Sequence, residues 1–177
     1  MTSQKILVAL DRSEQAPFVF EQALAQCKDQ NSHLMMVHIL HTKVHVSTAP
    51  LMGLGTLADV DLYRTQKQQQ QERVQEERQQ AQLWLTEYYQ KAIASHTPTG
   101  MECRTGEPGV EICSLAKEWN ADLIVMGRRG HQGILEAALG SISSYVVHHA
   151  PCSVLVVQGK LPEIAKASGE VLEIQAT

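Results

Sequence analysis

Short apolar runs alternate along the chain with longer segments in which apolar residues recur every three or four positions. A short, continuous apolar run is typical of a strand that is buried on both faces, whereas the three-to-four spacing indicates an amphipathic helix. The pattern predicts five strands, at residues 5–10, 34–40, 98–105, 123–127 and 153–157. The third of these has few aliphatic residues, so we expect it at an edge of the sheet.

Helices are predicted between the strands. The first has Ser13 as its N-cap and an apolar stripe that includes Phe20 and Ala23, and a long one is expected at about residues 58–95. Strands that alternate with helices require parallel pairing and right-handed crossovers. The sequence therefore predicts an α/β fold, a three-layer, doubly wound sheet of five parallel strands in the flavodoxin-like (Rossmann-like) order 3-2-1-4-5.

A single domain is expected at a length of 177 residues. We assign it to residues 1–158, with residues 159–177 as a tail that adds an edge strand or reaches a second subunit. Within the domain, residues 58–82 form a polar, glutamine-rich helical insert. Nine of the seventeen residues from Gln66 to Gln82 are glutamine, so these turns have almost no face to bury. They are either a solvated extension or an arm for a partner.

A glycine-rich loop follows the fourth predicted strand. Gly127, Gly130 and Gly140 lie in it, and Ser141 begins a helical segment. The unpaired N–H groups and the dipole of a helix N-terminus favour an anion, and glycine lets the backbone approach a phosphate closely. Alternatively, Gly140 only makes a turn and Ser141 only caps the helix. The two further glycines, directly after a buried strand, favour the phosphate interpretation.

The glycine spacing indicates which kind of phosphate loop this is. It matches neither G-x-G-x-x-G nor the Walker motif. The pattern G-x2-G-x9-G-S, beginning at Gly127, instead resembles the ATP-binding class of the universal stress protein family. The likeness extends to the strand that ends at Asp11 and to G-E-P at residues 106–108, and it covers most of residues 4–158.

This resemblance implies an adenine nucleotide as the ligand. The Asp11 carboxylate would bind the ribose, the backbone of Ala9 and Leu10 would lie near the adenine, and Ile39 would form a wall of the adenine pocket. The phosphates would lie against the N–H groups of the glycine loop. The expected nucleotide-binding residues are Ala9, Leu10, Asp11, Ile39, Met126, Gly127, Arg128, Arg129, Gly130, His131, Gly140, Ser141 and Ile142.

The predicted fold brings the two parts of this site together. Ligands of open α/β sheets lie outside the carboxyl ends of the strands, where the strand order reverses. In the order 3-2-1-4-5 this point lies between strands 1 and 4, so Asp11 and the loop after Gly127 meet in one crevice. Arg128, Arg129 and His131 either neutralise phosphate charge there or are solvated loop residues. Asp11 also has an alternative role, because a carboxylate favours a helix N-terminus.

Catalytic groups are sparse around this site. Hydrolysis needs a positioned base or a water-orienting residue, and the nearest carboxylates, Asp11 and Glu136, form no obvious pair. We therefore expect a regulatory, stress-response protein that binds ATP, ADP or AMP as a nucleotide-dependent switch, with slow ATP hydrolysis at most. Mg²⁺ would accompany the nucleotide, held by phosphate oxygens and water. Two alternatives stay open: a nucleotide hydrolase or flavin-binding enzyme of related fold, and an interaction module that works through the glutamine-rich helix.

Three histidines, His38, His41 and His45, suggest a metal site, since imidazole binds zinc, nickel or copper. At a strand end that passes into a loop they would not share a face. No cysteine or carboxylate stands beside them to complete a tetrahedral set. We therefore predict no metal ligands.

Composition and charge narrow the range of partners. The formal net charge is −4, so no global basic field steers the chain to nucleic acid or to an anionic membrane. The four cysteines form no C-x-x-C pair, no apolar stretch approaches the ~20 residues of a membrane span, and no signal segment precedes the first strand. We expect a cytoplasmic protein with reduced thiols. The family resemblance further implies a homodimer, formed through the fifth strand, Ser153–Val157, and the tail; any other protein partner is unknown.

Overall fold

A parallel sheet of five strands lies at the centre of the protein. The strands are β1 (Lys5–Ala9), β2 (His33–Leu40), β3 (Thr99–Thr105), β4 (Leu123–Gly127) and β5 (Ser153–Val157). Their order is β3-β2-β1-β4-β5 and every neighbouring pair is parallel, which confirms the predicted topology. The computed structural model describes residues 4–27, 31–41, 57–128 and 139–158, with the side chains of residues 57–63 excepted.

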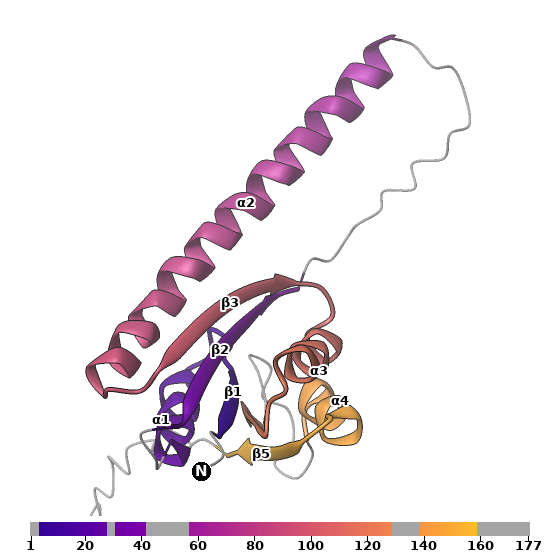
Figure 1. Ribbon diagram of the computed structural model, residues 1–177. Helices are drawn as coiled ribbons and strands as arrows, with labels where there is room; N and C mark the ends of the chain where they lie inside the picture. The colour runs from indigo at the N-terminus through magenta and orange to yellow at the C-terminus, as the bar shows by residue number, and fades with distance from the viewer. Residues whose placement is uncertain (1–3, 28–30, 42–56, 129–138, 159–177) are drawn as a thin grey trace, which may run out of the picture.

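Helices cover both faces of the sheet, as the alternating pattern predicted (Figure 1). They are α1 (Ala16–Gln26), α2 (Leu57–Ala94), α3 (Pro108–Trp119) and α4 (Ser141–His149). One core cluster joins α1 and α2 to the first face, and a second joins α3 and α4 to the other. The result is the predicted three-layer, flavodoxin-like architecture.

The central strands are buried on both faces, which explains why their sequences are continuous apolar runs. In β1, Ile6 and Val8 face the core under α1 and α2, whereas Leu7 faces the core under α3 and α4. The side chains of all three are fully buried. β3 lies at an edge of the sheet, as predicted, and none of its residues is fully buried. The side chains of the sheet thus divide the core into two clusters, one above and one below it.

The start of α1 differs from the prediction. The helix begins at Ala16 with Gln15 at its N-cap position, and Ser13 does not cap it. Instead, the Ser13 backbone N–H and hydroxyl both donate to Asp11 Oδ1, at 3.2 and 2.5 Å. An aspartate that captures the second residue after it forms a local turn, and this turn competes with helix capping.

α2 closely matches the predicted helix at residues 58–95. Its predicted packing stripe is buried, and the members of the stripe are Ala81, Leu85, Tyr88 and Ala92. Residues 64–73 are all exposed, and Figure 1 shows this part of α2 extending away from the sheet. No helix in the described part of the chain is both long enough and apolar enough to cross a bilayer. The predicted tail, residues 159–177, lies outside the described residues.

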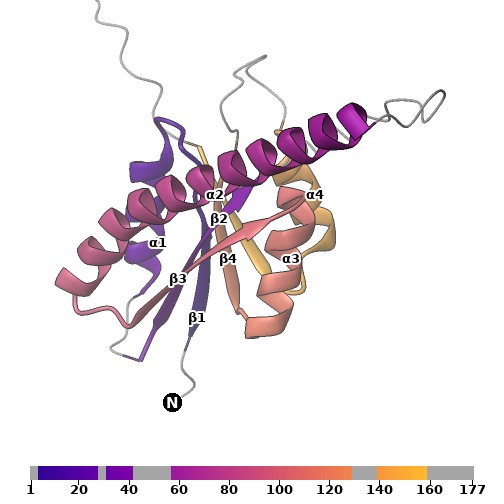
Figure 2. The ribbon, with the colours of Figure 1, turned by 90° about the horizontal axis from the view of Figure 1, so that it is seen from above.

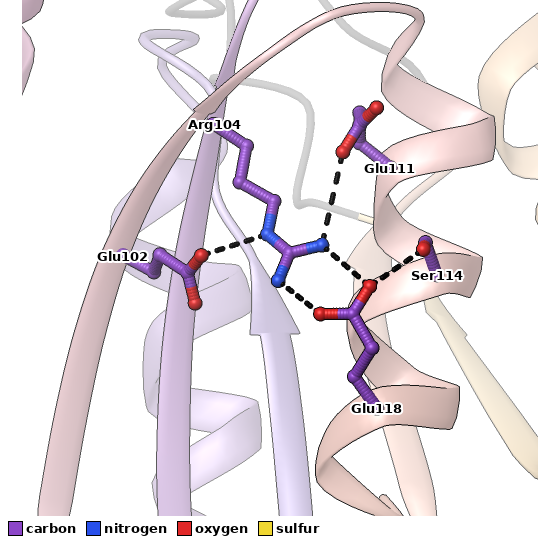
Figure 3. A network of polar contacts seen from close by, with 5 residues as sticks. All are labelled: Glu102, Arg104, Glu111, Ser114 and Glu118. Atoms are coloured by element: carbon purple, nitrogen blue, oxygen red, sulfur yellow. Dashed lines mark hydrogen bonds and ion pairs between the residues drawn. The ribbon is translucent and has the colours of Figure 1, made fainter.

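An arginine on the edge strand ties β3 to α3 (Figure 3). Arg104 Nε donates to Glu102 Oε1 at 2.8 Å, and the two Nη atoms of Arg104 donate to the Glu118 carboxylate at 2.6 and 3.2 Å. Glu111 lies 3.7 Å from the same guanidinium, and Ser114 Oγ donates to Glu118 at 2.7 Å. The hydrogen bonds from Arg104, which have the larger effect, and from Ser114 lower the pKa of Glu118 to about 2.

Candidate functional site

A cavity of about 980 Å³ opens at the carboxyl ends of β1, β2 and β4. Every predicted site residue that the structure describes lines it: Ala9, Leu10, Asp11, Ile39, Met126, Gly127, Arg128, Gly140, Ser141 and Ile142. The other predicted residues, Arg129, Gly130 and His131, lie outside the described residues. The strand order therefore gathers the two predicted parts of the site around one space, and the binding role of these residues stays a prediction.

The floor of the cavity is held by backbone bonds at the end of β1. The Leu10 N–H donates to the Val37 carbonyl at 2.9 Å, and the Leu10 carbonyl lies 2.8 Å from His38 Nδ1. Because a carbonyl oxygen only accepts, His38 Nδ1 carries the proton in this bond. The His38 ring also packs edge-on against the Trp84 ring of α2, with centroids 5.2 Å apart. His38 thus links α2 to the strand end beneath the cavity.

The two described histidines of the series, His38 and His41, both line the cavity but make different contacts. His38 is buried against Leu10, whereas His41 is exposed at the end of β2, with Nδ1 3.7 Å from Glu107 Oε1. His45 lies outside the described residues. In residues 4–27, 31–41, 57–128 and 139–158, no three His, Cys, Asp or Glu side chains are placed to hold a metal ion.

The thiols are held in their protonated form. All four cysteines are free and half-buried. Burial raises the pKa of Cys27 to about 11 and raises the pKa of the others, namely Cys103, Cys113 and Cys152. A thiolate is the reactive form of cysteine, so these residues are poor nucleophiles at neutral pH. The cysteines act as small apolar side chains at the edges of the core clusters.

Asp11 stands at the rim of the cavity directly after β1. Its Oδ1 atom accepts both bonds from Ser13, and this turn fixes the orientation of the carboxylate. Its Oδ2 atom has no hydrogen-bond partner among the residues that the structure describes. Asp11 is half-buried and lines the cavity, so one carboxylate oxygen is available to accept hydrogen bonds from a ligand.

The two ends of the glycine loop are joined at the cavity wall. The Arg128 carbonyl accepts from the Gly140 N–H at 3.0 Å and from Ser143 Oγ at 2.7 Å. The Arg128 N–H in turn donates to the Val157 carbonyl of β5 at 2.8 Å. Sequence reasoning missed Ser143, a serine on the buried side of α4 beside Val146. Its position on an otherwise apolar stripe was the signal that could have identified it.

The N-terminus of α4 forms part of the same wall. Gly140 is the N-cap residue, with φ −63° and ψ 158°, and no side chain caps the helix. Ser141 is the first helical residue, so the alternative in which it caps the helix is wrong. Ser141, Ile142 and Ser143 line the cavity in the first turn, where backbone N–H groups lack helical partners. Together with the helix dipole and Arg128, this end of the cavity favours an anion.

α2 supplies a wall that sequence reasoning also missed. Glu77 and Gln80 line the cavity although both belong to the glutamine-rich stretch. In Figure 2, α2 crosses the sheet near the carboxyl ends of β2 and β3, against which it packs. The sequence pattern of a uniformly polar helix face does not indicate what that face contacts. Only the tertiary structure therefore reveals that Glu77 and Gln80 line the cavity.

The family model of universal stress proteins matches residues 2–158 of the chain. The chain belongs to the universal stress protein family. A relative from Synechocystis sp., the universal stress protein Sll1388, is 38% identical over 156 residues, which is 87% of this chain and 97% of the relative. The resemblance read from the glycine motif is therefore confirmed at the level of the family.

Solved structures share the fold of this universal stress protein. The structure of the hypothetical protein MJ0577 has a TM-score of 0.70 at 20% identity and covers 91% of this chain and 99% of its own. A universal stress protein in complex with cAMP has a TM-score of 0.57 at 20% identity, and the match covers 90% of this chain and 99% of that protein. An Arabidopsis thaliana family member with AMP bound has a TM-score of 0.57 at 17% identity and covers 93% and 97%. At these identities the likeness establishes the fold.

Proposed function

We propose that this universal stress protein binds an adenine nucleotide in the cavity at the carboxyl ends of β1, β2 and β4, as part of a stress-response role. The observation that carries the proposal is that the half-free carboxylate of Asp11 and the uncapped N-terminus of α4 face the same cavity. Family members with cAMP and with AMP support the choice of an adenine nucleotide.

The lining chemistry indicates how the nucleotide lies. Phosphates fit against the first turn of α4, where N–H groups, the helix dipole and the Arg128 side chain favour negative charge. The ribose hydroxyls donate to the free oxygen of Asp11, and the base lies at the β2 side of the cavity, against apolar side chains such as Ile39. ATP brings Mg²⁺ with it, bound through phosphate oxygens and water.

The protein acts as a switch rather than as an efficient hydrolase. Asp11 is the only carboxylate among the described residues that lies at the β1 side of the cavity, and its one engaged oxygen holds the β1–α1 turn. We expect ATP hydrolysis to be slow at most, because among the described residues no second carboxylate lies beside Asp11 at the β1 side of the cavity to orient a water. Bound nucleotide instead alters the surface that a partner meets.

The edge strand β5 supports a homodimer as part of the same proposal. Among the described residues β5 is the last strand of the sheet, and its Val154, Leu155 and Val156 are only half-buried. An apolar edge strand is a template for pairing with another strand. Sedimentation of the purified protein measures the mass of the assembly and so distinguishes a dimer from a monomer.

The proposal also includes a cytoplasmic location. Fractionation of cells tests this location.

The direct test is to denature the purified protein and chromatograph the released small molecules. Release of AMP, ADP or ATP, or saturable heat on titration with one of them, supports the proposal. Release of flavin would identify the enzyme alternative. Absence of any bound nucleotide together with no heat from AMP, ADP, ATP or cAMP would show that the proposed function is wrong.

A further inference from the structure

The cavity has two chemically different walls. One is formed by Arg128 and the N-terminus of α4, and the other by Glu77 and Gln80 of α2. α2 packs against β2 and β3, whereas Arg128 follows β4. Because the sheet order is β3-β2-β1-β4-β5, the two walls stand on opposite sides of the end of β1. The first wall favours anions, and the second offers a carboxylate and an amide.

One face of α2 presents both residues of the second wall. Glu77, Gln80 and Trp84 are spaced at i, i+3 and i+7, so they lie on the same side of the helix. The Trp84 ring packs against the His38 ring, and His38 Nδ1 donates to the carbonyl of Leu10, itself a cavity-lining residue. The packing that holds Trp84 therefore also aims Glu77 and Gln80 at the cavity.

We propose that Glu77 and Gln80 contact the base of the bound nucleotide and select a base that carries an exocyclic amine. This inference rests on the proposed function. Phosphates at the α4 wall leave the base at the opposite, β2 side of the cavity, where α2 lies. The negative charge of Glu77 disfavours the reverse orientation, in which the phosphates would lie against α2.

The two side chains have different roles because they differ in hydrogen-bonding capacity. A carboxylate only accepts, so Glu77 bonds the amine of adenine and opposes the oxygen that replaces this amine in hypoxanthine. The Gln80 amide both donates and accepts, so it pairs with the amine and a ring nitrogen of adenine and rotates to suit hypoxanthine. Selectivity between the bases therefore depends on Glu77, whereas Gln80 contributes affinity for both.

Calorimetric titration with AMP and with IMP tests this assignment on the full chain. Glu77→Gln is expected to lower the ratio of AMP affinity to IMP affinity about tenfold, because the new amide can donate to the base oxygen. Gln80→Ala is expected to weaken binding of both nucleotides by about threefold to tenfold and to leave their ratio unchanged.

The neighbouring residues of α2 provide matched controls. Glu76→Gln and Gln79→Ala make the same chemical changes at exposed positions that are not among the residues lining the cavity. Both are expected to bind AMP and IMP as the parent protein does, and melting of each unliganded variant verifies that it folds. If AMP binds but Glu77→Gln keeps the parent ratio, the inference is wrong and the proposed function stands. If the parent protein binds neither nucleotide, the proposed function itself is wrong.

Discussion

Single side chains hold the cavity in shape before any ligand enters. Asp11 orders the turn that begins α1 through Oδ1 and leaves Oδ2 to the cavity. His38 joins the floor of the cavity to α2, and Ser143 joins the two ends of the glycine loop. In each of these residues, one polar atom makes hydrogen bonds within the protein itself. Fixed donors and acceptors of this kind reduce the ordering that binding requires.

Replacing Asp11 tests the ribose contact. Asp11→Ala is expected to weaken AMP binding about tenfold or more, because a hydrogen bond to a charged group contributes about 1.5–3 kcal/mol. Calorimetry measures the affinity. Glu21→Ala removes the same charge from an exposed position of α1 and controls for net charge. Ser13→Ala keeps the carboxylate, so an equal loss in Ser13→Ala and Asp11→Ala would contradict a direct contact.

Glu118 makes stability depend on pH. The bonds from Arg104 and Ser114 lower the pKa of Glu118 from 4.5 to about 2 in the folded protein. A carboxyl whose pKa falls on folding stabilises the folded state above its unfolded pKa, and this contribution is lost as the pH falls toward the folded pKa. Urea unfolding should therefore show the parent protein more stable than Glu118→Gln at pH 6, with a difference that shrinks by pH 3. A constant difference, or an equal trend in Glu14→Gln at an exposed position, would contradict this role.

At the scale of elements, the helices differ in how closely they are packed. α3 and α4 pack together on one face of the sheet, and Gly109 of α3 lets the Tyr145 ring of α4 approach. Among the described side chains of α2, residues 64–94, only those of the C-terminal half are buried. Helical turns without tertiary contacts depend on propensity alone, which rarely keeps them formed. Tertiary contacts, with the sheet as well as between helices, therefore decide which helical turns are stabilised.

Gly109→Ala tests the approach of α3 to α4. A Cβ atom at this position would lie 2.7 Å from Tyr145 Cδ1 and 3.2 Å from Tyr145 Cβ. Overpacking of this kind costs about 1–3 kcal/mol, which outweighs the gain of about 0.5–1 kcal/mol from replacing a helical glycine. Chemical denaturation should show a net loss of stability, and Tyr145→Ala in the same chain should reduce the loss. Gly100→Ala is the control, because its Cβ would meet only the flexible end of Met35 at 3.0 Å.

Bound nucleotide should stabilise the N-terminal part of α2, residues 64–80. Glu77 and Gln80 lie next to Ala81, the first fully buried residue of the helix as the structure describes it. A ligand contact there extends the packed part of α2 toward its N-terminus, and helix formation is cooperative. Hydrogen exchange of residues 64–80 should slow when AMP is added, and Glu77→Ala with Gln80→Ala should remove the effect. Unchanged exchange with AMP bound would show that α2 does not respond to the ligand.

At the scale of the whole molecule, the strand order brings residues from both ends of the domain to the carboxyl ends of the strands. β1 and β4 lie side by side at the centre of the sheet, so Asp11 and Arg128 line the same cavity. In a doubly wound sheet, ligands bind outside the carboxyl ends of the strands, at the point where the strand order reverses. Ligand binding at the carboxyl ends of the strands should therefore stabilise the whole fold as well as α2.

Ligand linkage provides the measurement at this scale. AMP at about a hundredfold excess over its dissociation constant should add about 2.7 kcal/mol to the free energy of unfolding. The gain should rise with the logarithm of the AMP concentration in denaturant unfolding at fixed protein concentration. Asp11→Ala should shift this dependence to higher concentration. A gain that saturates early, or none at all, would show that AMP does not bind preferentially to the folded chain.

The sequence by itself determined the elements and their order in the sheet, and it predicted the residues after β1 and β4 that line the cavity. Buried parallel strands have a local signature, because burial on both faces requires a continuous apolar run, as in residues 123–127. Alternation with helices then restricts the sheet to few topologies. Glycine and serine after a buried strand are equally local, so the wall around Gly140 was predicted from spacing alone.

Only the tertiary structure decided which polar side chains reach across space. Ser13 was predicted to cap α1, but its hydroxyl donates to Asp11 instead. The two local hydrogen bonds are of similar strength, so the sequence alone cannot show which of them forms. Ser143, Glu77 and Gln80 join the cavity wall because α4 and α2 are placed there by apolar residues elsewhere along each helix. A polar residue on a helix surface carries no periodic signal of what it faces, so its neighbours depend on the packing of the whole chain.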